Sequence, residues 1–233
     1  MKDKESGLTR ASSVYEAIRL DIIEGRYTPG TKLLFDTLRE RYGVGISPIR
    51  EALSRLHSDG WVDREEQRGF RVAEVSKDEL LELVKTRILI EGIAVDESIA
   101  QYNTDMEEAL VLAFHRLSKQ TRFLPTGTHV RNPKWENLHR EFHAALIAGC
   151  KLKWIVGYCR QLFDVAERYR LLSAASYPER NELDEHRAIL DAFLAGDAET
   201  VKQLLARHYQ VTVDLIIKAG FAATTPAPSM IAD

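Results

Sequence analysis

Cysteine is scarce in this chain, and long apolar runs are missing altogether. Only two cysteines, Cys150 and Cys159, occur among 233 residues, which does not match a disulfide framework and fits a reducing cytoplasm. No apolar run approaches the roughly 18 residues that span a bilayer. The first 13 residues are polar and charged and lack the apolar core of a secretion signal. We therefore expect a cytoplasmic protein that has no membrane partner.

The chain also lacks an excess of charge of either sign. It holds 32 basic and 35 acidic residues, for a net charge of −3 with neutral histidines. Residues 1–75 contain 13 of each sign, so the net charge belongs to residues 76–233. Any DNA-binding hypothesis must therefore depend on where single arginines lie. The apolar fraction of 45% is enough for a core and excludes a wholly disordered chain.

Two patterns of apolar spacing divide the chain near residue 75. Before it, capping and turn residues predict helices at about 12–24, 36–42 and 47–59 and a two-stranded hairpin across 61–72. After it only helical periodicity appears, at about 76–101, 104–120, 134–149, 151–174, 179–195 and 197–219. These patterns predict a mainly α fold, with a winged helix-turn-helix at 1–75, an all-α bundle at 76–221 and a disordered tail at 222–233.

The helix at 47–59 has the features of a DNA-reading helix. Ser47 and the free amides at the helix start can hold a phosphate. By helical phase, Arg50 and Ser54 point away from the apolar stripe, and an arginine in the first turn can reach a guanine. At the hairpin tip, Arg68 offers a cation and Gly69 permits close approach of the backbone. The alternative is a protein-binding module with ordinary surface charges.

Two stretches of this unit resemble a known family. YGVGISPIREALSRLHSDGWV, followed by EEQRGFRVAEV, is similar to the DNA-binding domain of the GntR family of bacterial transcription factors over about residues 12–75. Many members of that family carry arginines where this chain has Ile46 and Asp36, so those two contacts should be missing and the operator should differ. The resemblance implies DNA contacts by Ser47, Pro48, Arg50, Arg68 and Gly69.

Four of the seven histidines lie on apolar faces of the predicted bundle. His139 and His143 are four residues apart on one helix and therefore share a face. His186 and His208 lie about equally far from the break at residues 196–197, so an antiparallel hairpin places them at nearly the same level. Convergent imidazoles predict a divalent metal site, zinc first, with nickel or manganese as alternatives. The alternative is a set of hydrogen-bonded core histidines.

The bundle also resembles a known domain. LHREFHAALIAGC, EHRAILDAFLAGD and the late His208 are similar to the FCD domain, the effector-binding bundle of the FadR subfamily of GntR regulators, over about residues 76–215. The resemblance implies a metal site and a small organic-acid ligand, with His143, His186 and His208 at ligand positions. The family usually has an aspartate where this chain has His139, which would make the site entirely imidazole.

Three polar residues on apolar stripes are candidates for binding the effector. Arg87 lies among apolar helix positions, and a buried arginine is costly unless an anion compensates its charge. That anion is a ligand carboxylate or, in the alternative interpretation, Glu91 one turn further along the helix. Gln161 and Arg168 fall on another predicted inward stripe, with Trp154.

These features together predict a homodimeric transcription factor, with repression as the preferred sign. Its partners would be a palindromic operator in double-stranded DNA and a small carboxylate, with a dicarboxylate as one candidate, which binds at the metal and lowers operator affinity. The alternative is a metal-responsive regulator in which the ion itself is the signal. A metalloenzyme is disfavoured because Glu141 and Glu185, the nearest candidate bases, are predicted not to share the inward direction of the histidines.

Overall fold

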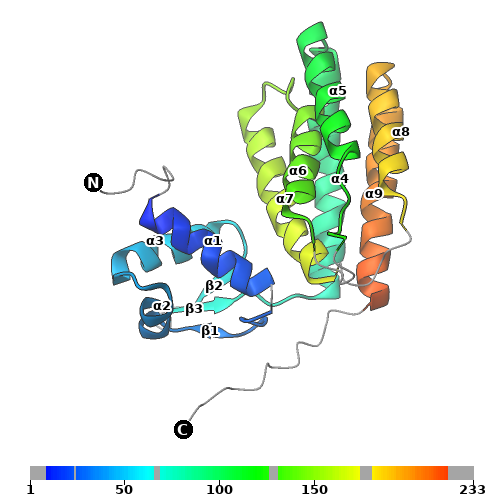
Figure 1. The fold of residues 1–233 in the computed structure, drawn as a ribbon. Coiled ribbons are helices and arrows are strands. Elements are labelled where there is room, and N and C mark those ends of the chain that lie inside the picture. Colours follow the sequence, from blue (N-terminus) through cyan, green and yellow to red (C-terminus); the bar gives the residue numbers. More distant parts are fainter. Residues whose placement is uncertain (1–8, 24, 66–68, 126–130, 174–179, 220–233) are drawn as a thin grey trace. The chain divides into compact units, whose positions relative to one another are not determined.

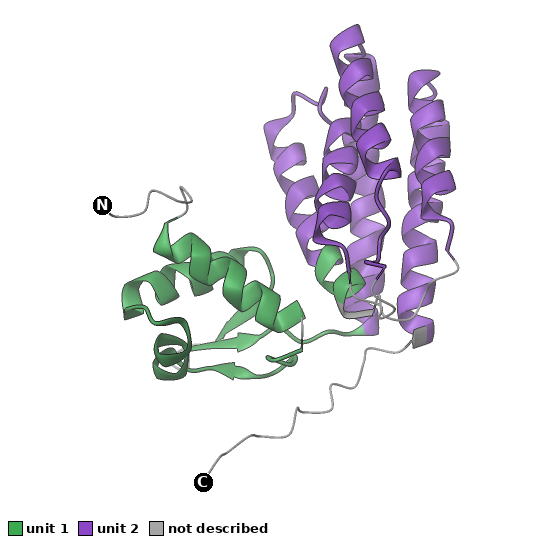
Figure 2. Ribbon diagram, viewed as in Figure 1, with its two compact units in different colours: residues 1–76, 167–172, 221–233 green, residues 77–166, 173–220 purple. Residues whose placement is uncertain are grey.

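The computed structural model describes residues 9–23, 25–65, 69–125, 131–173 and 180–219. The chain divides into two compact units (Figure 1, Figure 2). The first contains the residues up to Ser76 together with Glu167–Leu172, and the second contains Lys77–Ala166 and Ser173–Gly220. Arg68, His129 and the predicted disordered tail lie outside the described residues.

The first unit is a winged helix-turn-helix, as the sequence predicts. Strand β3 lies between β1 and β2 in a three-stranded antiparallel sheet. The sequence does not predict β1, because two residues are too few to show an alternating pattern. The elements of this unit are α1 (Arg10–Ile23), β1 (Lys32–Leu33), α2 (Phe35–Tyr42), α3 (Ile46–Ser58), β2 (Val62–Glu65) and β3 (Gly69–Val72).

The position of α3 follows from one apolar face and one tight turn. The α3 side chains Ile49, Ala52, Leu53 and Leu56 are fully buried in the core of the unit. Gly43 ends α2 with a left-handed φ of 62°, a conformation that costs glycine little and other residues more. The turn and the buried face together leave the opposite side of α3 in solvent.

Asp21 is a buried carboxylate that ties α1 to α2. Its Oδ2 accepts hydrogen bonds from Arg41 Nε and from the Tyr42 hydroxyl, both at 2.7 Å. Its other carboxylate oxygen pairs with Arg26. Burial, followed by the hydrogen bond to Asp21, raises the pKa of Tyr42. The charge of Asp21 is therefore compensated within the unit.

Helices joined by turns and loops make up the described part of the second unit, which also contains one isolated β-bridge between Phe123 and Arg131. Helix α4 packs on α9, α5 on α6, and α8 on both α5 and α9. The predicted helices are confirmed with ends shifted by a few residues. Their bounds are α4 (Lys77–Ala100), α5 (Thr104–Ser118), α6 (Pro133–Leu146), α7 (Lys153–Ser173), α8 (Glu182–Leu194) and α9 (Ala198–Ala219).

Asparagine side chains mark the starts of three helices in this unit. Asn103, Asn132 and Asn181 each accept a hydrogen bond from a backbone amide in the first turn of α5, α6 or α8. Such caps satisfy amides that have no partner inside the helix. Within the described part of the chain, no helix is both long and apolar enough to cross a membrane.

Candidate metal centre and DNA-reading helix

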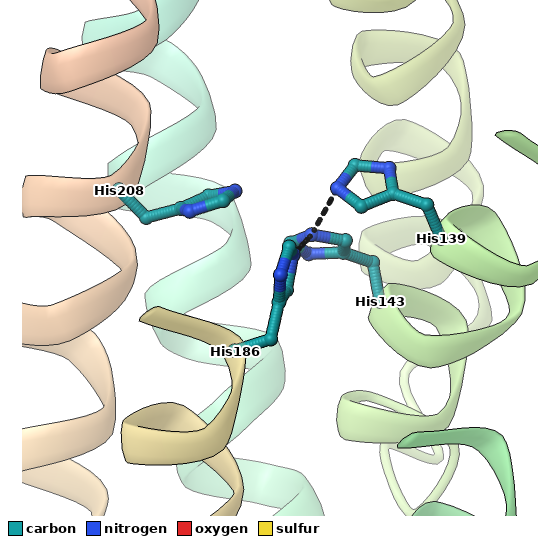
Figure 3. Close-up of side chains that lie close together, drawn as sticks. All are labelled: His139, His143, His186 and His208. Carbon is teal, nitrogen blue, oxygen red and sulfur yellow. Dashed lines mark hydrogen bonds between the residues drawn. The ribbon is translucent and has the colours of Figure 1, made fainter. Parts of the chain in front are cut away.

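The structure brings together all four histidines that the sequence singles out. His139 and His143 come from α6, His186 from α8 and His208 from α9, and their rings turn toward one another (Figure 3). All four are buried, and one ring nitrogen from each lies within 4.8 Å of the others. Three helices therefore supply one small group of imidazole donors.

The spacing of the ring nitrogens fits a metal ion. His143 Nε2 lies 3.2 Å from His139 Nε2 and 3.4 Å from His186 Nε2. A tetrahedral zinc ion with Zn–N bonds of about 2.0–2.1 Å separates its ligand nitrogens by roughly 3.3–3.4 Å. The His139 ring also stacks on Trp135, with centroids 4.7 Å apart, and this contact holds its orientation.

Hydrogen bonds at Nδ1, the outer ring nitrogen on the side away from the cluster, set the tautomers of His186 and His208. His186 Nδ1 lies 2.6 Å from the carbonyl oxygen of Glu182. Because a carbonyl only accepts, Nδ1 carries the proton and Nε2 presents a lone pair to the cluster. His208 Nδ1 lies 2.6 Å from Glu185 Oε2, and the same reasoning applies. Facing lone pairs repel one another unless a cation lies between them, so the donor set suits a metal.

Glu185 and Arg180 form a second layer around His208. Arg180 holds the Glu185 carboxylate through Nε and Nη2 at 2.9 and 2.6 Å and donates to the His208 carbonyl at 2.9 Å. The expectation that Glu185 does not share the direction of the histidines is wrong, because its side chain reaches across from α8 to α9. Arg180 lies before the capping residue Asn181, where no periodic pattern predicts its direction.

Arg87 is compensated within the bundle. It pairs with Glu91, whose Oε1 lies 2.7 Å from Nη2 and 2.8 Å from Nε. Burial is the largest single influence and would lower the Arg87 pKa, but the attraction to Glu91 and Tyr209 and the hydrogen bond to Glu91 together outweigh it, and the pKa is raised. The Tyr209 hydroxyl donates to the other oxygen of Glu91 and lies 3.5 Å from His143 Nδ1. The structure therefore contains the ion pair with Glu91 that was the alternative interpretation of Arg87. A role for Arg87 in binding the effector stays a prediction.

The exposed side of α3 carries the residues expected to contact DNA. Ser47, Arg50 and Ser54 are exposed, and Pro48 is half-buried in the first turn. The guanidinium of Arg50 lies over the Phe35 ring, 5.5 Å from its centroid. Gly69 begins β3 with φ of +94°, which a side chain would strain. DNA contact by these residues stays a prediction.

Family models match both units. The model described as "Bacterial regulatory proteins, gntR family" matches residues 10–72, and the FCD domain model matches residues 82–211. The chain belongs to the GntR family of bacterial regulators, with an FCD domain. It is therefore a DNA-binding transcriptional regulator, and the predicted resemblance and fold class are confirmed.

Relatives of this GntR regulator carry matching descriptions. An HTH-type transcriptional regulator named BphR from Paraburkholderia xenovorans strain LB400 is 36% identical over 89% of this chain and 85% of its own length. The HTH-type transcriptional repressor GlaR of Escherichia coli strain K12 is 31% identical over 88% of this chain and 94% of its own length. The solved structure of E. coli McbR/YncC superposes with a TM-score of 0.70 at 24% identity, over 91% of this chain and 98% of that one, and shows the shared fold.

Two of the predicted effector residues of the GntR regulator lie in unexpected surroundings. Gln161 is exposed, and Trp154 is 73% exposed, so the predicted inward stripe is wrong at these positions. Arg168 is buried and belongs to the first unit, where it donates to the carbonyls of Gly60 and Glu74 at 2.6 and 3.2 Å. An effector role for Arg168 stays a prediction.

The other described histidines lie at the surface. His115 is exposed on α5. His57 is exposed at the end of α3, with its Nδ1 2.9 Å from the Val62 carbonyl oxygen. The third, His129, is not among the described residues.

Proposed function

We propose that this GntR regulator is a homodimeric repressor whose operator affinity is lowered by a small organic acid bound at a divalent metal. The observation that carries the proposal is the group of four buried imidazoles from three helices. His139, His143, His186 and His208 would hold the ion, with zinc as the first expectation and nickel or manganese as alternatives. Neutral imidazoles would leave its double positive charge uncompensated, which attracts a carboxylate.

The surrounding residues of the chain position these donors. Glu182 and Glu185 hold the outer nitrogens of His186 and His208, and Tyr209 lies beside the outer nitrogen of His143. Such outer contacts fix ring orientation and strengthen the donor nitrogens. The Arg87–Glu91 pair, which Tyr209 contacts through Glu91, adds no net charge. The attraction for an acid would therefore come from the metal ion held by the four histidines.

The other half of the proposal concerns DNA. Ser47, Arg50 and Ser54 on the exposed side of α3 would enter the major groove, and Gly69 would bring the wing close to the backbone. Two copies of such a helix match a palindromic operator, because a two-fold dimer reads two-fold DNA. The name of GlaR as a repressor supports the sign of the regulation.

A second candidate function follows from the number of donors. Four protein ligands complete the tetrahedral shell of a structural zinc site and leave no open position. In that case the ion itself would be the signal, and the chain would be a metal-responsive regulator. Zinc that expands to five ligands, or an octahedral ion such as nickel or manganese, would still admit a carboxylate beside the same four donors. Acid binding to the metal-loaded protein therefore distinguishes the two functions.

One binding experiment tests both the acid-responsive and the metal-responsive function. An operator is selected from random duplexes, and its affinity for the full-length protein is measured by fluorescence anisotropy without metal, with each metal, and with metal plus mono- and dicarboxylates. Release by an acid only when metal is bound supports the proposed function. Release by the metal alone supports the metal-responsive alternative. Affinity that ignores both metal and acids contradicts both.

A further inference from the structure

A cavity between α6 and α7 leads to the histidine cluster. Its volume is about 830 Å³, within the roughly 300–1,000 Å³ that small-molecule sites occupy. His143 and Glu91 line its inner end, so a molecule inside it would touch the cluster directly. All of its lining residues belong to the second unit.

The inner part of this cavity is mostly apolar. Phe163, Cys159 and Ile147 are buried in its lining, and several alanines of α6 and the turn after it widen the space. Burial, followed by repulsion from Glu91, raises the pKa of the Cys159 thiol to about 12. The thiol therefore stays uncharged near neutral pH and acts as a small apolar group.

The mouth of the cavity is rich in positive charge. Lys151, Lys153 and Arg160 are exposed there, against the single exposed carboxylate of Glu141. Arg140 and Asp164 also line it, but they pair with each other and add no net charge. The excess of cations would attract an anion toward the entrance.

A second, smaller cavity borders the cluster on the side of His186. Its volume is about 300 Å³, and polar residues make up much of its lining. Arg122 and Arg180 are its cations, and both pair with Glu182. An apolar group placed there would bury these polar groups away from water at a cost in free energy. The two cavities therefore favour ligands of different chemistry.

We infer that the α6–α7 cavity binds the effector, and that the effector is a monocarboxylic acid with an aromatic or aliphatic body. Its carboxylate lies toward the cluster at His143, and its body lies among the apolar side chains of α6 and α7. A compact diacid fits less well, because its second carboxylate would lie in the apolar part without a partner. The inference rests on the proposed function and names the class of ligand for it.

Calorimetric titration of the zinc-loaded, full-length protein tests the class of ligand. The probes are acetate, butyrate, hexanoate, benzoate and phenylacetate, with malonate and succinate as compact diacids. Each methylene buried in an apolar site strengthens binding by about fourfold, so hexanoate should bind more than tenfold tighter than acetate. Malonate and succinate should bind no tighter than acetate.

Two tryptophan variants test the place of binding. Ala144→Trp fills the α6–α7 cavity from an exposed backbone position, and Thr121→Trp does the same in the smaller cavity. We expect Ala144→Trp to weaken phenylacetate binding at least tenfold and Thr121→Trp to change it less than twofold. Zinc content and circular dichroism should stay at the wild-type level in both. Ala148→Trp provides a second block of the same cavity if Ala144→Trp does not fold.

The results separate this inference from the proposed function. The inference is wrong if diacids bind best or if apolar acids bind no tighter than acetate. It is also wrong if Thr121→Trp weakens binding while the α6–α7 variants do not. In each of these cases acid binding at the metal, and with it the proposed function, still stands. If none of the acids binds the zinc-loaded protein, the inference fails as well. In that case the operator measurements with each metal decide the proposed function separately.

Discussion

Replacing Glu185 with glutamine should weaken metal binding at the histidine cluster. The carboxylate lies 2.6 Å from His208 Nδ1 and is held by Arg180 through two contacts. Glutamine keeps the size of the side chain and an accepting oxygen, but it removes the negative charge that strengthens His208 as a donor. It also removes one of the two carboxylates that pair with Arg180, whose Nη2 lies 3.1 Å from the same ring nitrogen.

The expected size of this effect follows from the geometry. Loss of an outer partner of a metal-bound histidine costs about 10–100-fold in metal affinity. Glu185 is 28% exposed at its side chain, and solvent screens part of its charge. We therefore expect Glu185→Gln near the lower end, about tenfold, and Glu185→Ala near the upper end, about 100-fold, because alanine also removes the accepting oxygen.

Competition for zinc against a chromophoric chelator measures this affinity. Glu141→Gln is the matched control, since Glu141 also lies on a helix that carries cluster histidines but is exposed on α6. It should bind zinc within twofold of the wild type. Equal zinc affinity of Glu185→Gln and the wild type would refute the role given to the carboxylate. Failure of the wild type to bind any divalent ion would refute the metal site as a whole.

Three further substitutions test the rest of the molecule. Arg50→Ala should cost about 1–3 kcal/mol of specific DNA binding if the arginine reads a base, and an unchanged gel-shift affinity would remove it from the interface. His208→Ala should lower zinc content and abolish the response to acids while operator binding persists, and full zinc occupancy measured by mass spectrometry would count against its role. Asp21→Asn should lower the free energy of unfolding by about 1–2 kcal/mol, because a neutral amide accepts the hydrogen bonds of Arg41 and Tyr42 more weakly than the carboxylate does, and denaturation in urea with an unchanged midpoint would contradict that account.

Local patterns in the sequence predict much of the fold. Asparagine caps mark the starts of α5, α6 and α8 through hydrogen bonds that form within a few residues, and these starts lie within three residues of those predicted from the sequence. The meeting of the histidines is also predictable, because His139 and His143 share one helical face and a short turn makes α8 and α9 antiparallel. These inferences need only helical geometry and chain connectivity.

Helical phase was a poor guide where the apolar residues of a helix are not buried. The stripe that placed Gln161 inward included Trp154, which is 73% exposed. Apolar character alone therefore misassigned the buried side of α7. The sequence does not predict strand β1 for a different reason. A two-residue strand is defined by its pairing with β3 and is too short to show an alternation of apolar and polar residues.

The sequence by itself determined the family, the two kinds of unit, and which histidines lie on inward faces. Only the tertiary structure decided which partners surround them: Glu185 and Arg180 at His208, Tyr209 beside His143, and the cavity between α6 and α7. Those contacts join residues from different helices or from a turn. Their side-chain directions depend on packing between helices, which local spacing along one chain does not encode.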